Sequence, residues 1–439
     1  MYFCWSIKPL QLPRMSKFLK IFSIIVISLF ALSVFGWMAS HITRGDKKFG
    51  FLTGPVKFIY SFPDLFTQSV EEVKTLALPK TFIPTPEDFK PVNELDTDFI
   101  VLTTWSDTSD ARSVVLLNLK NDSVLFKWTL ENPYREHDRI LNPLLLPGKS
   151  LVYAFDGFSG LRRIDSLGNV LWTQDTILAH HSMNMDGNGD IWICSWEPVF
   201  HATGQYKLDG RDVFYKDEYI TRIDTATGRI LFHRSMTGIL SGNNLSYYLL
   251  KSSAITDPMH INDVEPACKS TRYYQEGDVF ISARNPSIIL HYRPSTDKVV
   301  RLIEGPFVSQ HDVDLLDDNS LVLFNNNYYT VETRDSKPPP RDSSRLDFAG
   351  DFYSNIVRYD FGTGTFSFIG DSVFRAHEIF SFTEGLVEFT DPVTYLVEEQ
   401  NEGLIWIIRD DKVIYKNVLA SWHEGFHHLP NWMRVIHND

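Results

Sequence analysis

The stretch QHDVDL, Gln310–Leu315, precedes an apolar segment, Leu321–Phe324, that has the composition of a β-strand. Two earlier stretches have the same form: MHINDV, Met259–Val264, and HHSMNM, His180–Met185. In each, a histidine opens a short alternating run, acidic and small residues come after it, and an apolar strand comes next. One histidine before a strand is usually satisfied by packing. Three in successive similar units indicate a repeat fold that brings the imidazoles together.

A second recurring pattern consists of two apolar runs separated by Asp, Gly or Asn. Those turn residues allow the positive-φ backbone that tight β-hairpins need. Six copies occur, at Ser113–Trp128, Gly160–Trp172, Tyr219–Phe232, Ile288–Leu302, Asn355–Phe368 and Leu404–Val418. Their spacing is near or above that of propeller blades. We therefore predict an all-β fold, a six-bladed β-propeller over residues 96–420. A β-sandwich explains the strands but not the recurrence of one hairpin.

Composition narrows the classes of function. The chain has 439 residues, of which 43% are hydrophobic, so it can bury a sizeable core. Its formal net charge of -13 argues against nonspecific binding to nucleic acid, which requires clustered Lys and Arg.

Residues 18–40 form an almost wholly apolar stretch, long enough for a helix that crosses a bilayer. Basic residues precede it, and they predict that residues 1–17 stay in the cytoplasm or are an upstream extension. We favour an uncleaved membrane anchor over a cleaved signal, with the propeller exported to the periplasm or cell exterior. Residues 41–95 are expected to be a connector that packs on the propeller, and residues 421–439 an aromatic tail that packs across it.

Two of the three cysteines, Cys194 and Cys268, lie C-terminal to the apolar stretch. In an oxidising compartment they can form a disulfide, but two free thiols fit the sequence equally well.

In a propeller the innermost strand of each blade lines a central channel. If His181, His260 and His311 begin such strands, their side chains project into one funnel. The loops that return to the same face contain Trp196, Arg284–Asn285 and Asn325–Asn326. Arg284 is thus expected to face the same space as the histidines.

Three interpretations fit this group of residues. Transfer of an anionic group such as sulfuryl or phosphoryl needs a histidine nucleophile or acid/base, and an arginine that stabilises the oxyanion. Three histidines also suit a zinc or copper site. In the third interpretation these side chains merely bond across the blades.

Four motifs, in this order, resemble those of the bacterial arylsulfotransferase family. They are DPMHINDV at Asp257–Val264, DVFISARN at Asp278–Asn285, SQHD at Ser309–Asp312 and LFNN at Leu323–Asn326. The family's pattern is His-Ile/Val-Asn, then Ser-Ser/Ala-Arg and a polar residue, then Gln-His and a Phe-Asp/Asn-Asn turn. The likeness extends from about Thr85 to Leu419.

The resemblance implies an exported six-bladed propeller that moves a sulfuryl group between phenolic compounds without a diffusible nucleotide cofactor. By the same likeness, His260 and His311 polarise groups or move protons, and Arg284 binds sulfate oxygens. His181 joins them from the repeat alone. No metal or other cofactor is expected, and the partner is a small phenol or aryl sulfate. The residues expected to contact substrate are Asn262, Asn285, Asn325, Asn326, Trp196 and Glu399.

The chain departs from the family in its last blade. The family's sulfuryl-carrying histidine belongs there, but Tyr395–Gly403 contains no histidine. Three outcomes stay open. His181 or His311 carries the sulfuryl group; or Glu398 or Glu399 is the base for another anionic or phenolic substrate; or the propeller binds anionic or aromatic ligands, or a metal, without turnover.

Overall fold

The structure is a computed structural model of the chain, and it describes residues 17–43, 49–56, 58–59, 81–108, 111–133, 139–198, 204–208, 210–252, 254–328 and 353–436. The chain divides into two compact units, Met1–Leu78 and Pro79–Asp439. The predicted connector and tail fall partly outside the described residues.

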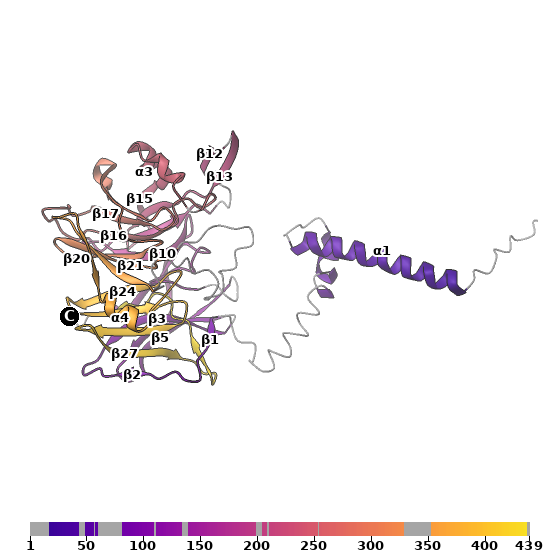
Figure 1. Ribbon diagram of the computed structural model, residues 1–439, viewed down its shortest axis with the longest axis horizontal. Coiled ribbons are helices and arrows are strands. Elements are labelled where there is room, and N and C mark those ends of the chain that lie inside the picture. The colour runs from indigo at the N-terminus through magenta and orange to yellow at the C-terminus, as the bar shows by residue number, and fades with distance from the viewer. Residues whose placement is uncertain are drawn as a thin grey trace, which may run out of the picture. The chain divides into compact units, whose positions relative to one another are not determined.

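The N-terminal unit contains α1 (Lys17–Thr43) and the short 3-10 helix η1 (Gly50–Leu52) (Figure 1). Within α1, Leu19–Ala39 is long and apolar enough to cross a membrane. The apolar helix predicted from residues 18–40 is confirmed, while its cleavage and orientation stay predictions.

The second unit is an all-β propeller (Figure 1). Its described residues form five four-stranded antiparallel sheets. The first is β29 (Arg434–Val435), β3 (Ile100–Thr108), β4 (Ala111–Asn118), β5 (Ser123–Glu131). The second is β6 (Leu144–Leu146), β7 (Ser150–Tyr153), β8 (Leu161–Ile164), β9 (Val170–Gln174). The third is β10 (Leu178–Met185), β11 (Ile191–Trp196), β14 (Tyr219–Ile223), β15 (Ile230–Ser235).

The fourth sheet is β16 (Ile261–Pro266), β17 (Val279–Ala283), β18 (Ile288–Arg293), β19 (Lys298–Ile303). The fifth is β20 (His311–Asp317), β21 (Ser320–Asn325), β22 (Asn355–Asp360), β23 (Phe366–Ile369). Short elements lie between strands: β12 (Gly204–Leu208) and β13 (Arg211–Tyr215), helices α3 (Met236–Gly242) and α4 (Asp371–Ala376), and η2 (Pro147–Lys149), η3 (Ser246–Leu249), η4 (Pro294–Thr296).

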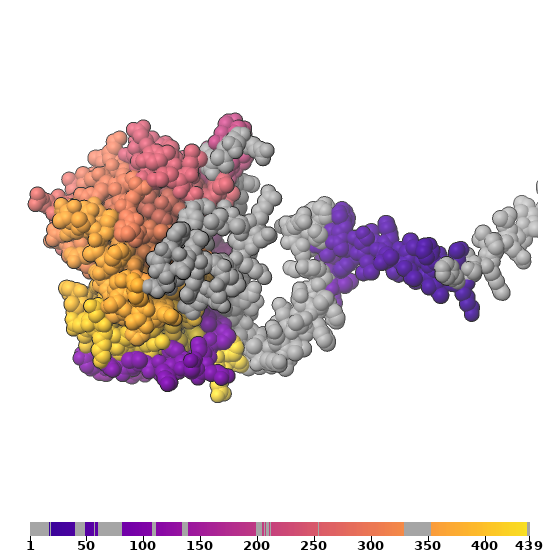
Figure 2. All heavy atoms as spheres, viewed as in Figure 1, coloured from indigo at the N-terminus to yellow at the C-terminus, as the bar shows by residue number. Residues whose placement is uncertain are grey.

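The remaining strands form a seven-stranded sheet, so the prediction of a six-bladed propeller is wrong: the described residues form five four-stranded blades and this larger sheet. Its members are β24 (Leu386–Asp391), β25 (Thr394–Glu399), β26 (Leu404–Arg409), β27 (Lys412–Ala420), β28 (Phe426–His428), β1 (Phe82–Pro84) and β2 (Val92–Asn93). The nine-residue β27 has an outer edge long enough to pair with both β2 and β28. In Figure 2 the purple residues of β1 and β2 accordingly lie against the yellow C-terminal residues.

The predicted hairpin turns form by the chemistry that the sequence indicates. Asp224 Oδ1 accepts hydrogen bonds from the backbone N–H groups of Ala226 and Thr227, and Gly228 takes a φ of 73°. Asp360 and Gly364 repeat this arrangement in another blade. The apolar faces of neighbouring sheets pack on one another, as where Ile261 and Val264 meet Trp192.

The thiols of Cys194 and Cys268 are free, so the disulfide alternative is wrong.

Candidate functional site

The three histidines of the recurring motif lie together. The ring of His181, in β10, is centred 5.2 Å from that of His260 and 6.3 Å from that of His311. A fourth ring joins them, because Trp432 is centred 6.0 Å from His181 and 6.1 Å from His311. Four separate sheets thus place one side chain each at a common point.

A left-handed backbone recurs where the first strand of each sheet begins. The residues that share it, with φ from 44° to 57°, are Asn142, His181, His260, Asp312, Glu384 and Trp432. In β10 and β20 it coincides with a β-bulge, whereas in β16 the bulge follows His260, between Ile261 and Asp263. Bulges re-aim side chains, and strained residues of this kind persist where the surroundings fix them. The bulges in β10 and β20 thus interrupt the regular strand alternation beside His181 and His311.

His260 forms a pair with a carboxylate that precedes it on the same loop. Its Nδ1 lies 2.5 Å from Asp257 Oδ2, which accepts the hydrogen bond. Burial alone would raise the pKa of Asp257, but His260, His180 and Lys216 lower it overall, so the carboxylate is charged. The other nitrogen of His260, Nε2, is consequently the one that can exchange a proton with a ligand.

The tautomer of His311 is set by its partners. Nδ1 lies 2.7 Å from Asn326 Oδ1 and 3.1 Å from Ser309 O, and both oxygens can only accept. Asn326 is oriented in turn, because its Nδ2 donates to Ser381 O and Glu384 O. Burial and the charge of Arg284 lower the pKa of His311 well below its usual value. His311 is therefore neutral at pH 7, with its lone pair on Nε2.

His181 is held by a second imidazole, since its Nδ1 lies 2.8 Å from His180 Nδ1. Burial lowers the pKa of both rings, so a neutral imidazole donates to a neutral imidazole in this contact. His180 stacks on Trp196, 4.2 Å between ring centres, and Trp196 Nε1 donates to Glu218. A Cβ on Gly157 (φ 70°) would lie 2.9 Å from the Trp196 ring, so only glycine lets this stack form.

Arg284 comes directly after β17 and is only 8% exposed. Its backbone N–H donates to His260 O, and its Nη1 donates to Asn285 Oδ1. Its positive charge disfavours protonation of both His181 and His311. A buried guanidinium next to neutral imidazoles is an arrangement that suits an anion.

The other expected contact residues are engaged in the scaffold. Asn262 Nδ2 donates to Gln310 O, and Asn325 Nδ2 donates to Asn355 Oδ1. Glu399 accepts hydrogen bonds from Phe380 N and Trp406 Nε1. These side chains thus fix loops and strands around the histidines.

Several residues at the site gave no sequence signal. Arg139 binds Glu384 through two hydrogen bonds, although 245 positions separate them. Asp156 Oδ1 accepts from His181 N, and burial raises the pKa of Asp156 to about 6. Only Asp257, three residues before His260, stood near a motif.

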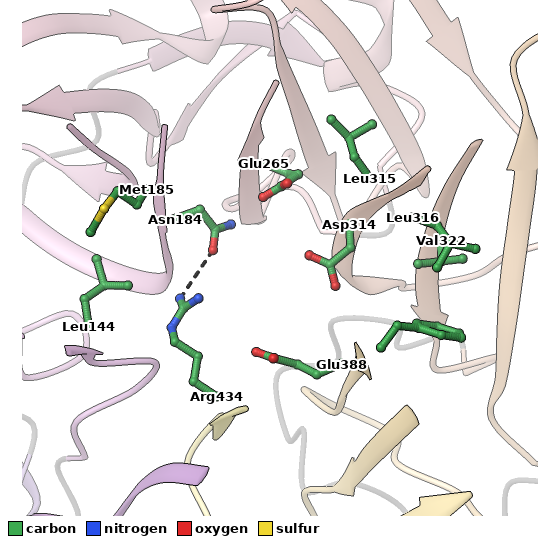
Figure 3. A pocket seen from close by; sticks show the side chains of 11 residues that line it. Leu144, Asn184, Met185, Glu265, Asp314, Leu315, Leu316, Val322, Glu388 and Arg434 are labelled. Atoms are coloured by element: carbon green, nitrogen blue, oxygen red, sulfur yellow. Dashed lines mark hydrogen bonds between the residues drawn. The ribbon is translucent and has the colours of Figure 1, made fainter. Parts of the chain in front are cut away.

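A second feature lies toward the other ends of the same strands. A cavity of about 360 Å³ opens there, and Figure 3 shows carboxylates and one guanidinium pointing into it. The charged residues among its lining are Glu265, Asp314, Glu388 and Arg434. Among the residues that the structure describes, no group of three His, Cys, Asp or Glu side chains is arranged to hold a metal ion.

Comparison with solved structures finds chains of low sequence identity. A protein of unknown function from Bacteroides caccae is 8% identical, with a TM-score of 0.49 over 78% of this chain and 99% of that one. Virginiamycin B lyase from Staphylococcus aureus is 11% identical, with a TM-score of 0.37 over 77% and 89% of the two chains. A search of curated proteins finds no match.

The family comparison is more specific. The family described as Arylsulfotransferase (ASST) matches residues 142–415, which include all four quoted motifs and the three histidines. Because that match covers more than half of the sequence, the chain belongs to the arylsulfotransferase family.

Proposed function

We propose that the protein transfers a sulfuryl group from an aryl sulfate to a phenol, and that His311 carries the group. The observation that carries this proposal is the fixed tautomer of His311. A neutral imidazole with Nδ1–H held by Asn326 presents a lone pair on Nε2. Family membership favours sulfuryl as the group that is transferred.

The first half-reaction is a substitution at sulfur. His311 Nε2 attacks, an N–S bond forms, and the S–O bond to the aryl oxygen breaks. The phenolate that leaves takes the proton of the His260 Nε2–H. In the second half-reaction an acceptor phenol returns a proton to His260, its oxygen attacks sulfur, and the N–S bond breaks. No oxidant, reductant or nucleotide is consumed.

Two further groups support these steps. Asp257 stabilises the imidazolium form of His260 through the hydrogen bond to Nδ1. Arg284 neutralises charge on the non-reacting sulfuryl oxygens. The burial of Arg284 strengthens that attraction, because the surrounding dielectric is low. With His311 as the carrier, the reaction needs no histidine in Tyr395–Gly403.

Helix α1 anchors the protein, in this proposal, with the propeller in the periplasm or outside the cell. The apolar length of Leu19–Ala39 supports the anchor. Basic residues before the helix support export of the propeller domain. Small phenols and aryl sulfates are then available without entry into the cytoplasm.

The test is transfer from an aryl sulfate donor to a phenol by the purified full chain. His311→Ala and His260→Ala should each lose activity by at least about 100-fold. His377→Ala removes an exposed histidine at the C-terminal end of α4 and should leave the rate unchanged. Mass spectrometry after a rapid quench should find one SO₃ group on wild type with donor alone, and none on His311→Ala. Full transfer by His311→Ala would remove the assignment.

A further inference from the structure

The indole N–H of Trp432 is buried and has no hydrogen-bond partner in the described structure. The side chain has 0% exposure, so water does not solvate the donor from outside. An unsatisfied buried donor costs free energy unless something that binds there accepts from it.

Burial of an unpaired indole N–H is by itself insufficient to indicate a ligand. Trp128 is also buried, and its Nε1 also has no partner among the described residues. Trp128 packs in one apolar cluster, with Leu102, Val114 and Ile164, and Trp432 belongs to another. Trp432 differs because two imidazoles of the candidate site, His181 and His311, lie beside it.

Hydrogen bonds to the backbone of Trp432 and of its neighbours hold the residue in position. Glu398 accepts the N–H groups of Trp432 and Met433, each at 2.9 Å, one on each carboxylate oxygen. Asn431 Nδ2 donates to Thr104 O, and Gln400 Nε2 donates to Pro430 O. With φ at 51°, the residue is held in a strained conformation that these contacts stabilise. The backbone that carries the ring is thus held in place.

We infer that the Trp432 indole N–H donates a hydrogen bond to the anionic group bound between His181, His311 and Arg284. This inference rests on the proposed function, since it names a further residue that binds the sulfate oxygens. Trp432 precedes β29, which pairs with β3. The pairing that joins the C-terminal segment to the first blade therefore also completes the anion site.

The test uses inorganic sulfate as the probe and the full chain as it exists. Trp432→Phe keeps an aromatic ring but removes the donor, so sulfate should bind about 10-fold more weakly. Trp128→Phe makes the same change in an apolar core and should leave sulfate affinity unchanged. A second measurement is made on wild type itself: the ¹⁵N–¹H indole resonance that disappears in Trp432→Phe should shift as sulfate is added.

The outcomes separate the two ideas. The inference alone would be overturned by three results together. Sulfate binds to wild type, and Arg284→Met weakens that binding. The Trp432 resonance does not shift, and Trp432→Phe binds sulfate as tightly as wild type. Wild type that binds no sulfate and transfers no sulfuryl group would overturn the proposed function, and this inference with it.

Discussion

His260 Nδ1 and Asp257 Oδ2 are 2.5 Å apart, and Asp257 remains charged although it is partly removed from water. The pair joins a residue of the recurring motif to a residue of the loop before it. In the proposed reaction it keeps a proton on Nδ1 and stabilises the imidazolium, so that Nε2 is the nitrogen that gives and takes the proton.

We expect Asp257→Asn to lower the transfer rate by on the order of 100-fold, because the amide no longer stabilises the imidazolium. Steady-state rates with an aryl sulfate and a phenol measure this. The control is Asp278→Asn, which breaks a buried aspartate–histidine pair away from the site: Asp278 binds His291 Nε2 at 2.8 Å. The control should lower the melting temperature and keep the rate per folded molecule. Equal rate losses in both variants would contradict a specific role for Asp257.

Asn326→Asp should move the acid limb of the pH–rate profile to higher pH. A carboxylate at 2.7 Å from His311 Nδ1 favours the imidazolium and raises the pKa of His311. Nε2 is then protonated, and so unreactive, over more of the pH range. Asn325→Asp changes the neighbouring amide, which binds Asn355 instead of a histidine, and should leave the limb in place. An unmoved limb in Asn326→Asp would show that His311 does not set it.

Stability should fall as pH rises from 7 to 8. Burial, with repulsion between neighbouring carboxyls, raises the pKa of Glu265, Asp312 and Asp314 well above the usual range. The folded chain therefore retains protons that the unfolded chain has lost, and its free energy of unfolding falls as pH rises until these groups ionise. Buried histidines with lowered pKa values act in the opposite sense, but only below about pH 6.5. Urea unfolding at constant ionic strength should show the decrease. A rise in stability over this interval would contradict the charge states assigned to the cavity.

Asp314→Asn should stabilise the protein at pH 8 by on the order of 1 kcal/mol, since it removes repulsion with Asp263 and Glu388. Toward pH 5 the gain should shrink, because Asp314 is already protonated in the folded wild type. Asp318→Asn alters an exposed carboxylate that binds Lys269, and its effect should be small. A gain in Asp314→Asn that is equal at both pH values would point to packing instead of charge.

Local chemistry is what the sequence reveals best. The turn at Asp224–Gly228 and its counterparts depend on neighbours in the chain, so their hairpins and the propeller class can be predicted from the pattern. The seven-stranded sheet cannot, because β1 pairs with β28 across more than three hundred residues. The prediction of a six-bladed propeller failed for that reason.

At the site, too, features set by local sequence can be predicted and features set by distant contacts cannot. His181, His260 and His311 could be grouped because each opens a repeated motif, and their rings do lie together. The salt bridge between Arg139 and Glu384 and the placement of Trp432 depend on closure of the ring, which no local pattern encodes. The contacts of Glu399, whose carboxylate accepts from Trp406 Nε1 and from Phe380 N, likewise depend on the fold; its contact with substrate stays a prediction.

The left-handed residue at the head of each first strand has an evolutionary consequence. A duplicated unit inherits the same left-handed backbone, so every copy begins with a residue held in the same conformation. A substitution at one of these positions, which holds His260 in one blade and Glu384 in another, changes the chemistry of that position without changing the sheets. Catalytic variety in such a ring can then accumulate one side chain at a time.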